Sequence, residues 1–262
     1  MRSVGKISPM HLSTLSWSVA AIVLAAVAVP AFGGRAATGQ EEHSPCTEDA
    51  MIVFDASGSM SGNGWGYGSE TAGVVSRIDK VRSTLAKILP KVTRSRRVGL
   101  ITYGPGVWNQ CNVHLDLPPT EHAAGRIITA VYALTPAGKT PLTESVSQAA
   151  KVLDFRVQPG LIVVLTDGEE TCGGSPCNLG EQLSVEAAKL TIHIISLRVK
   201  GYTWTGEQSA LEAKCLAERN GGLYLPVETQ DELMDALEKT LGCPMVTRVF
   251  RMLRTRTNHL SP

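Results

Sequence analysis

The chain has 262 residues and a formal net charge of +1, and no long linker interrupts its middle, which predicts one large domain. The charge is unevenly distributed: residues 32–243 contain 19 Lys and Arg against 24 Asp and Glu, while the segments on either side are basic. A mildly acidic central region argues against nucleic acid as the natural partner.

The first 33 residues have the pattern of a signal peptide. Arg2 and Lys6 precede an apolar run over residues 15–29, and small residues follow it in Pro30-Ala31-Phe32-Gly33. The run is shorter than the ~20 residues that span a bilayer, which favours cleavage over an uncleaved membrane anchor. We therefore expect export to the periplasm or the extracellular space. Residues 34–45 are predicted to be a disordered lead-in.

The elements of the first half begin with the apolar run Met51–Phe54, which predicts a buried strand. A glycine-rich loop over 61–73 follows it. Apolar residues at helical spacing then predict a helix over 76–89. Residues 97–103 predict a second strand, and alternation over 111–117 indicates a half-exposed edge strand.

The second half continues the alternation of helices and strands. Thr229 and Glu232 have capping-box spacing at the start of the last helix. The predicted elements are helices near 121–134 and 141–153, a strand at 161–166, a helix near 179–190, a strand at 191–199, a helix near 207–219, a strand at 223–227 and a helix to 241. This order predicts an α/β fold, a doubly wound, mostly parallel sheet with helices on both faces. The basic tail over 244–262 is expected to be a solvated end, with an amphipathic membrane-surface helix as the alternative.

Three oxygen-bearing side chains follow the first apolar run at intervals of two residues: Asp55, Ser57 and Ser59. In an extended segment such side chains point to the same side, so these three can converge on one point. Gly58 lets the backbone fold closely around that point. A carboxylate and two hydroxyls are hard ligands, suited to Mg2+ or a similar ion and not to zinc.

Two further segments supply oxygen atoms, and each has a simpler explanation on its own. Thr140 before Pro141 is typical of a helix N-cap, and Asp167-Gly168 after the apolar run 161–164 is typical of a turn. However, two of the three pieces end apolar runs that look like buried parallel strands. Ligands of open α/β sheets bind at such carboxyl ends. Because the three segments occur together, one shared metal site explains them better than a separate structural role for each.

Together, the D-x-S-x-S segment, the T-P-L threonine and the T-D-G aspartate resemble the metal-ion-dependent adhesion site of von Willebrand factor A domains, over roughly residues 46–243. The resemblance implies the Rossmann-like fold of that family, with 111–117 as its short antiparallel edge strand. The resemblance implies that five residues hold the ion, three by hydroxyls and two by carboxylates, directly or through water: Ser57, Ser59, Thr140, Asp55 and Asp167. With one ligand oxygen, they would fill the six positions of Mg2+; Mn2+ and Ca2+ are alternatives. The open position is expected to take an Asp or Glu of a protein or peptide partner. Such a site binds and does not catalyse.

A closer resemblance lies in the run TDGEETCGGSPC from Thr166 to Cys177 and in Cys215 before Ala217–Gly222. Both features are similar to a subgroup of exported bacterial von Willebrand factor A proteins. The partners of that subgroup are mostly undefined, so the resemblance indicates the cellular compartment of the protein more clearly than its function. The Mg-chelatase role of part of the wider family is not expected, because this sequence has no ATPase motif.

An enzyme is the alternative from another class. The segment 51–57 vaguely resembles the D-x-D nucleophile strand of Mg2+-dependent haloacid-dehalogenase-type phosphatases, but Ser57 stands where their general acid would be. A serine hydrolase has less support, because the sequence lacks G-x-S-x-G and ties neither His114 nor His193 to a nucleophile. A signal-anchored envelope scaffold is a further alternative.

The six cysteines are Cys46, Cys111, Cys172, Cys177, Cys215 and Cys243. An even number of cysteines in an exported protein predicts that they form three disulfides. In the implied fold, Cys46 and Cys243 lie on the face opposite the metal, where a bond between them would clamp the termini. A Cys172–Cys177 bond would pin the loop beside the metal, and Cys111–Cys215 is the pair that is left. A zinc site at Cys172 and Cys177 is less favoured, because no second Cys or His pair has matching spacing.

Aromatic residues in two segments are candidates for the rim of the site. Trp65 and Tyr67 lie in the glycine-rich loop directly after the serines, and Tyr202 and Trp204 follow a predicted strand. They either fold back onto the domain or offer a partner apolar contact area. We expect a ligand whose acidic group completes the metal shell while an apolar neighbour packs on Trp65.

Overall fold

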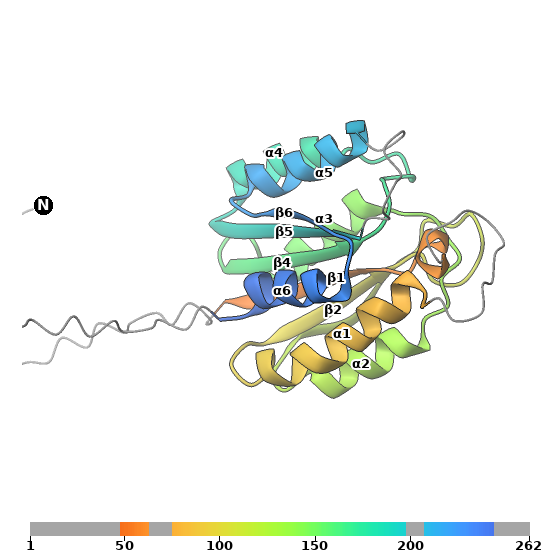
Figure 1. Ribbon diagram of the computed structural model, residues 1–262. Helices are drawn as coiled ribbons and strands as arrows, with labels where there is room; N and C mark the ends of the chain where they lie inside the picture. The colour runs from red at the N-terminus through yellow and green to blue at the C-terminus, as the bar shows by residue number, and fades with distance from the viewer. Residues whose placement is uncertain (1–47, 63–74, 198–206, 244–262) are drawn as a thin grey trace, which may run out of the picture. The chain divides into compact units, whose positions relative to one another are not determined.

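The computed structural model describes residues 48–62, 75–197 and 207–243 (Figure 1). Its strands are β1 (Asp49–Asp55), β2 (Val98–Tyr103), β3 (Val113–Thr120), β4 (Pro159–Thr166), β5 (Lys189–Leu197) and β6 (Tyr224–Val227). Its helices are the short 3-10 helix η1 (Gly58–Ser61), α1 (Arg77–Val92), α2 (Ala124–Ala133), α3 (Leu142–Val152), α4 (Pro176–Glu186), α5 (Glu207–Arg219) and α6 (Gln230–Leu241). The predicted signal peptide (1–33), lead-in (34–45) and basic tail (244–262) lie outside the described residues.

The six strands form one sheet in the order β3-β2-β1-β4-β5-β6. Every neighbouring pair is parallel except β2 and β3, which confirms the predicted doubly wound, mostly parallel sheet, and the edge strand expected at 111–117 is the antiparallel strand β3. Asp55 at the end of β1 pairs with Tyr103 of β2, and Phe54 pairs with Leu165 of β4. The strand order changes direction at β1, and open α/β sheets bind ligands in the crevice at such a point.

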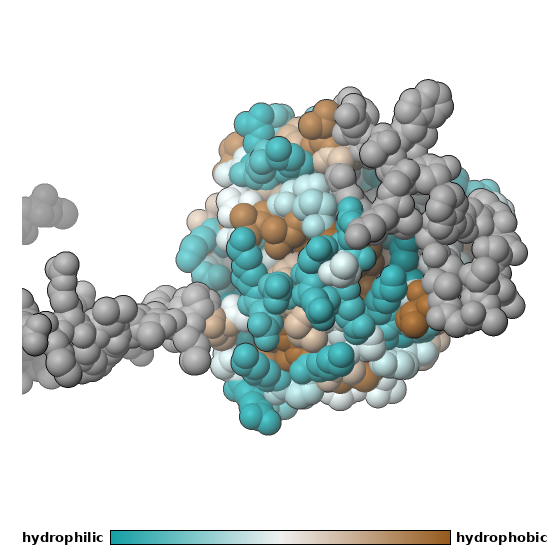
Figure 2. All heavy atoms as spheres, in the orientation of Figure 1, coloured by the Kyte–Doolittle hydropathy of each residue, from teal (hydrophilic) through white to brown (hydrophobic). Residues whose placement is uncertain are grey.

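The helices form two layers, one on each face of the sheet (Figure 1). Helices α1, α2 and α6 pack on one face, and α3, α4 and α5 pack on the other. In β1, Ile52 and Phe54 lie in the first core, whereas Met51 and Val53 lie in the second. Burial on both faces explains the unbroken apolar run of this strand. Figure 2 shows a mainly hydrophilic surface over α1 and α6, with small separate hydrophobic patches.

The ends of the helices follow from local sequence signals. The Thr229 hydroxyl accepts the Glu232 N–H at 3.2 Å, and the Glu232 carboxylate accepts the Thr229 N–H at 3.3 Å, which confirms the predicted capping box of α6. At the start of α1, the Ser76 hydroxyl accepts the Asp79 N–H at 3.2 Å. Across residues 48–62, 75–197 and 207–243, every helix is too short or too polar to cross a lipid bilayer.

Both edges of the sheet contain proline. The edge strand β3 includes Pro118 and Pro119, and the four-residue strand β6 at the opposite edge includes Pro226. Each proline lacks the N–H that a ladder position normally offers, which is why proline is confined to edge strands, strand starts and bulges. The hydrogen-bonding register between β2 and β3 is also irregular near this part of β3.

Candidate functional site

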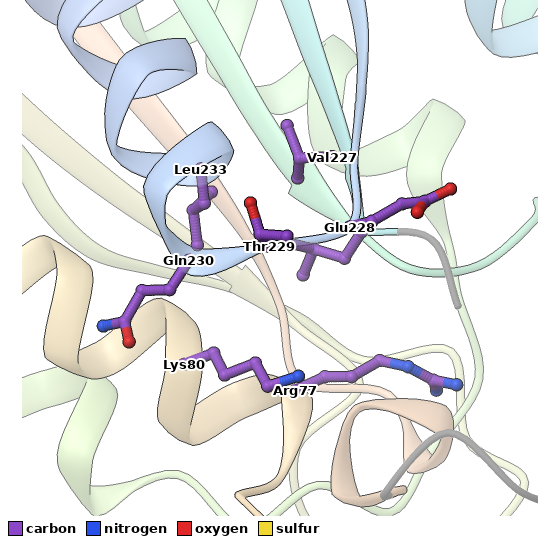
Figure 3. A pocket seen from close by; sticks show the side chains of 8 residues that line it. Arg77, Lys80, Val227, Glu228, Thr229, Gln230 and Leu233 are labelled. Carbon is purple, nitrogen blue, oxygen red and sulfur yellow. The ribbon is translucent and has the colours of Figure 1, made fainter. Parts of the chain in front are cut away.

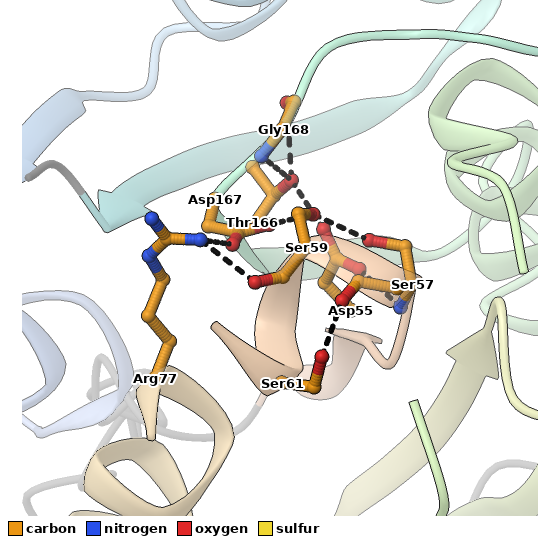
Figure 4. Close-up of polar contacts among 9 residues, drawn as sticks. Asp55, Ser57, Ser59, Ser61, Arg77, Thr166, Asp167 and Gly168 are labelled. Carbon is orange, nitrogen blue, oxygen red and sulfur yellow. Dashed lines mark hydrogen bonds and ion pairs between the residues drawn. The ribbon is translucent and has the colours of Figure 1, made fainter. Parts of the chain in front are cut away.

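Asp55, Ser57 and Ser59 converge as predicted, but by a different backbone path. The strand ends at Asp55, and η1 begins at Gly58, so Ser59 reaches the cluster on a helical turn and not on an extended segment. The Ser57 N–H donates to Asp55 Oδ1 at 2.7 Å, and the two serine Oγ atoms are 3.1 Å apart (Figure 4). A tight turn thus replaces the extended conformation because the Asp55 carboxylate accepts the backbone N–H two residues later.

Asp167 joins this cluster from the loop after β4. The Ser59 hydroxyl donates to Asp167 Oδ1 at 2.7 Å (Figure 4). Because β1 and β4 are parallel neighbours, their carboxyl ends bring Asp55 and Asp167 to the same edge of the sheet. The side chain of Asp167 has no exposed area, and Asp55 is fully buried.

Thr140 lies beside these groups, and its side chain does not cap α3. The N-cap of α3 is Pro141, without a side-chain cap, so the predicted alternative of a Thr140 cap is wrong. A Cβ atom placed on Gly168 would lie 3.4 Å from Thr140 Oγ1 and 3.6 Å from Ser59 Oγ, so both hydroxyls flank the same glycine. Within the part of the chain that the structure describes, the Thr140 hydroxyl makes no hydrogen bond.

The turn at Ser57 depends on a glycine in the loop after β2. Gly104 has a φ of +74°, and a Cβ atom there would lie 2.7 Å from Ser57 N and 2.8 Å from Lys139 O. Its carbonyl accepts the Gly138 N–H at 2.8 Å, and the Gly138 carbonyl accepts the Gly58 N–H at 3.0 Å. Only a residue without a side chain fits between these backbones, so Gly104 brings three loops together.

Three residues of the site were not assigned from the sequence. The Thr166 hydroxyl donates to Asp55 Oδ2 at 2.7 Å and so fixes the carboxylate from the second side. The Arg77 guanidinium donates to Asp167 Oδ2 and to the Ser59 carbonyl, both at 2.7 Å (Figure 4). The third, Tyr103, is fully buried on β2 opposite Asp55. Thr166 could have been found from its place in T-D-G, whereas no sequence pattern connects Arg77 with Asp167.

Burial dominates the electrostatics of the cluster. It raises the pKa of Asp55 above its ordinary value, against the lowering effect of the hydrogen bonds from Ser57 and Thr166. Burial and the neighbouring Asp55 carboxylate raise the pKa of Asp167 to about 6, although Ser59 and Arg77 favour its charged form. Burial, followed by the charge of Asp55, also raises the pKa of Tyr103. Two buried carboxylates thus repel one another where one arginine supplies the counter-charge.

This set of donors fits a hard divalent cation. Two carboxylates and three hydroxyls are oxygen ligands of the kind that Mg2+ binds, and a cation would relieve the repulsion between the carboxylates. The Ser59 hydroxyl already directs its hydrogen to Asp167, which leaves its lone pairs available to an ion. Among the described residues there is no group of three or more His, Cys, Asp or Glu side chains that could hold a metal, so this oxygen cluster differs from a transition-metal site.

A small groove lies next to the cluster, where α1 meets the start of α6 (Figure 3). Arg77 and Lys80 line it from α1, and residues 227–230 line it from the end of β6 to the first residue of α6, with Leu197 and Leu233 at its apolar side. Arg77 therefore lines this groove and also contacts the oxygen cluster, which places a positive charge between them.

The predicted aromatic rim lies outside the described residues. Trp65 and Tyr67 fall in 63–74, and Tyr202 and Trp204 fall in 198–206. The structure instead places Val107 and Trp108 at the surface, 59% and 67% exposed, on the loop after β2. This loop hydrogen-bonds to the segment before Thr140, so Trp108 is a rim candidate that sequence reasoning missed.

The predicted pairing of four cysteines is wrong. The structure joins Cys111 to Cys172 and Cys177 to Cys215, with Cα atoms 6.0 and 5.1 Å apart, in place of Cys172–Cys177 and Cys111–Cys215. Cys177 lies in the first turn of α4, which packs against α5, the helix that carries Cys215. Cys172 lies in the loop before α4, near the start of β3. Disulfides fit an oxidising compartment and leave no cysteine for a zinc site at 172 and 177.

The third predicted pair, Cys46–Cys243, stays a prediction because Cys46 lies outside the described residues. Cys243 is disulfide-bonded. Its sulfur also lies 3.4 Å from the Ser95 hydroxyl, just after α1. The end of α6 is therefore fixed near the loop that leads into β2, at the opposite end of the sheet from Asp55.

Comparison with known proteins gives one family match and several distant relatives. Residues 50–170 match the family model of the von Willebrand factor type A domain. The Bacillus subtilis (strain 168) proteins "Uncharacterized protein YwmC" and "Uncharacterized protein YwmD" are 25% and 27% identical to the chain, over 217 and 206 residues. These alignments cover 78% and 73% of this chain and 86% and 84% of the relatives.

Solved structures share the fold at low sequence identity. An aerotolerance-related membrane protein from Bacteroides fragilis NCTC 9343 aligns with a TM-score of 0.54 at 18% identity, over 74% of this chain and 98% of that chain. The PilB minor pilin from Streptococcus sanguinis aligns with a TM-score of 0.52 at 15% identity, over 74% and 60% of the two chains. A von Willebrand factor type A structure from Catenulispora acidiphila aligns with a TM-score of 0.54 at 16% identity, over 75% and 42%.

Proposed function

The family match and the shared fold support a von Willebrand factor type A domain, and from this premise we propose that the domain binds an acidic protein or peptide partner through a Mg2+ ion. The ion would be held by Asp55, Asp167 and the hydroxyls of Ser57, Ser59 and Thr140. One observation carries the proposal: two buried carboxylates with raised pKa values meet hydroxyl oxygens at the carboxyl ends of β1 and β4. This arrangement supports the proposal of a metal-ion-dependent adhesion site.

Mg2+ is the preferred ion for a chemical reason, with Mn2+ and Ca2+ as alternatives. Mg2+ takes six oxygen ligands and usually keeps several of its waters, so few protein carboxylates suffice to hold it. The five protein groups, bound directly or through such waters, leave one position for an Asp or Glu of the partner. The Arg77 guanidinium beside Asp167 adds positive charge at this edge and so favours an acidic ligand.

Binding is favoured over catalysis by the residues around Asp55. In a haloacid-dehalogenase-type phosphatase, a second carboxylic acid two residues after the nucleophile donates a proton. Here Ser57 holds that place, and its Oγ lies beside Ser59. A hydroxyl cannot serve as that acid at neutral pH. A phosphatase assay with Mg2+ tests this directly, since turnover that depends on Asp55 would refute a pure binding role.

We further propose that the protein is exported and acts in the periplasm or outside the cell. The Cys111–Cys172 and Cys177–Cys215 disulfides support an oxidising compartment. The run from Thr166 to Cys177 supports the exported bacterial subgroup. A membrane-anchored scaffold is the second candidate, and the size of the mature chain separates the two, because cleavage near residues 31–33 would remove the apolar segment.

The decisive experiment is a Mg2+ titration by calorimetry on Asp55→Asn with Asp116→Asn as its matched control. Both aspartates accept a threonine hydroxyl at 2.7 Å, from Thr166 and Thr102 respectively, but only Asp55 belongs to the cluster. We expect Asp55→Asn to abolish Mg2+ binding and Asp116→Asn to retain it. Unchanged Mg2+ affinity in Asp55→Asn would refute the assignment. Partner binding is then tested by a pull-down from the envelope fraction with Mg2+ against EDTA.

A further inference from the structure

The segment Gly138–Thr140, which delivers the Thr140 hydroxyl, is held from two sides. On one side, the Lys139 N–H donates to the Gln110 carbonyl at 2.9 Å. On the other side, the Thr140 N–H donates to Thr171 Oγ1 at 2.8 Å, and the Thr171 N–H donates to the Thr140 carbonyl at 3.0 Å. The position of Thr140 therefore depends on two loops that are 61 residues apart in the sequence.

The residues that hold this segment are the immediate neighbours of a disulfide. Gln110 precedes Cys111, Thr171 precedes Cys172, and these two cysteines are bonded to one another. The disulfide thus ties the two loops together across the segment that they support. Further hydrogen bonds anchor each end: the Asn112 carbonyl accepts the Gly104 N–H at 3.0 Å, and Glu170 accepts the Cys172 N–H at 2.7 Å.

We propose that the Cys111–Cys172 disulfide positions Thr140 for the metal, and that its reduction weakens metal binding. This inference rests on the proposed Mg2+ site. Without the bond, the loops of Gln110 and Thr171 are free to separate, and the Thr140 hydroxyl loses its fixed place beside Ser59. Groups that orient the direct ligands of a metal typically change its affinity 10–100-fold when they are removed.

The bond is accessible to a reductant from solution. Cys111 is exposed and Cys172 is half-buried. A dithiol attacks through one thiolate at the Cys111 sulfur, the Cys111–Cys172 bond breaks, and Cys172 leaves as a thiolate that takes a proton. The second thiol of the reductant then closes its own disulfide and releases Cys111. The dithiol loses two electrons and two protons, and the protein gains two thiols.

The second disulfide provides a matched control. Cys177–Cys215 joins α4 to α5, and neither cysteine adjoins a residue that hydrogen-bonds to Gly138–Thr140. The double variant Cys111→Ser/Cys172→Ser is therefore compared with Cys177→Ser/Cys215→Ser. Both variants lose one covalent loop, so a general loss of stability affects both, whereas a positioning role affects only the first.

Two measurements are made on each purified protein. Calorimetry with Mg2+ gives the affinity, and we expect Cys111→Ser/Cys172→Ser to bind roughly tenfold more weakly than the parent, with the control pair unchanged. Amide hydrogen exchange by NMR in EDTA reports the segment without any metal. We expect the Thr140 and Thr171 amides to exchange faster in the first variant only. Reduction of the parent protein and reoxidation should reproduce and then reverse both effects.

A second route covers the case in which the double variant does not fold. Thr171→Val keeps the Cys111–Cys172 disulfide but removes the oxygen that accepts the Thr140 N–H, and it should also weaken Mg2+ binding. Equal Mg2+ affinities in the two double variants, or unchanged Thr140 exchange after reduction, would overturn the proposal. If the oxidised parent does not bind Mg2+, the proposed function fails, and the exchange data alone decide whether the disulfide positions Thr140.

Discussion

The guanidinium of Arg77 and the carboxylate of Asp167 are 2.7 Å apart, at the edge of a cluster whose oxygen atoms suit a metal ion. Arg77 is 20% exposed at its side chain, while that of Asp167 is fully buried. The same guanidinium nitrogen also donates to the Ser59 carbonyl at 2.7 Å. The first residue of α1 therefore supplies a tethered positive charge to one of the two carboxylates that a metal would use.

This ion pair predicts that Arg77→Gln tightens Mg2+ binding. Removal of a cation beside Asp167 leaves more negative charge for the metal, and we expect roughly tenfold higher affinity, equivalent to about 1.4 kcal/mol. Lys87→Gln is the control, because Lys87 is an exposed cation farther along α1. Both affinities are measured by calorimetry at the same ionic strength. Weaker binding in Arg77→Gln alone would mean that the arginine helps to organise the site.

The raised pKa of Asp167 predicts how the stability of the metal-free domain depends on pH. The folded-state pKa is about 6 against an ordinary value of 3.8, so the folded state holds the proton more tightly than the unfolded chain. The free energy of unfolding should therefore decrease as pH rises from about 4 to 6, by on the order of 2–3 kcal/mol from this group. Urea unfolding in EDTA measures the change. Asp167→Asn should flatten this part of the profile, and an unchanged profile would contradict the assignment.

His193 predicts the opposite dependence on pH: its contribution to the free energy of unfolding should be lost as the pH falls. Burial, followed by the charges of Arg96 and Lys239, lowers its pKa below 6.5, and its Nδ1 accepts the Leu223 N–H at 2.9 Å. The unfolded chain thus binds the proton more tightly, so this contribution is present above pH 6.5 and is lost as pH falls through the folded-state pKa. His193→Asn should remove that loss on acidification. Urea midpoints of His193→Asn and the parent at pH 7.5 and 5 test it, and an equal fall in both would contradict the prediction.

The close approach at Gly104 predicts a large effect of a single methyl group. Gly104→Ala would place Cβ 2.7 Å from Ser57 N, in a backbone conformation with φ of +74°, so we expect lower stability and weaker Mg2+ binding. Gly106→Ala separates the two causes, because Gly106 also has a positive φ, +98°, but no atom lies within 4 Å of its Cβ position. Thermal unfolding and Mg2+ titration should show the larger loss for Gly104→Ala. Equal losses would assign the effect to backbone strain alone.

Local patterns were sufficient to predict the fold and much of the cluster. The buried runs before Asp55 and Asp167 identified two parallel strands, and adjacency of their carboxyl ends follows from the topology. Thr229 and Glu232 identified a helix start because a capping box involves only near neighbours in the chain. Thr140 was ambiguous because the same T-P pattern suits a helix cap, and only the structure, in which Pro141 is the N-cap of α3 and no side chain caps the helix, decides against it.

The disulfide pairing and the role of Arg77 could not be predicted in the same way. Cys172 and Cys177 are close in sequence, but the start of α4 directs Cys177 to α5 while Cys172 meets the loop before β3. Which cysteines form a bond depends on how the loops and helices that carry them are arranged in the folded domain. Arg77 likewise reaches Asp167 over 90 residues of separation, and such contacts have no local periodicity to reveal them.

The prolines at the two sheet edges limit how another protein can associate with this domain. An exposed edge strand normally offers a row of N–H and C=O groups on which a foreign strand can pair. Pro118 and Pro119 interrupt that row in β3, and Pro226 interrupts it in the four-residue β6. Strand addition and the growth of fibrous assemblies through these edges are therefore both disfavoured, and recognition is left to side chains and loops such as those around Asp55.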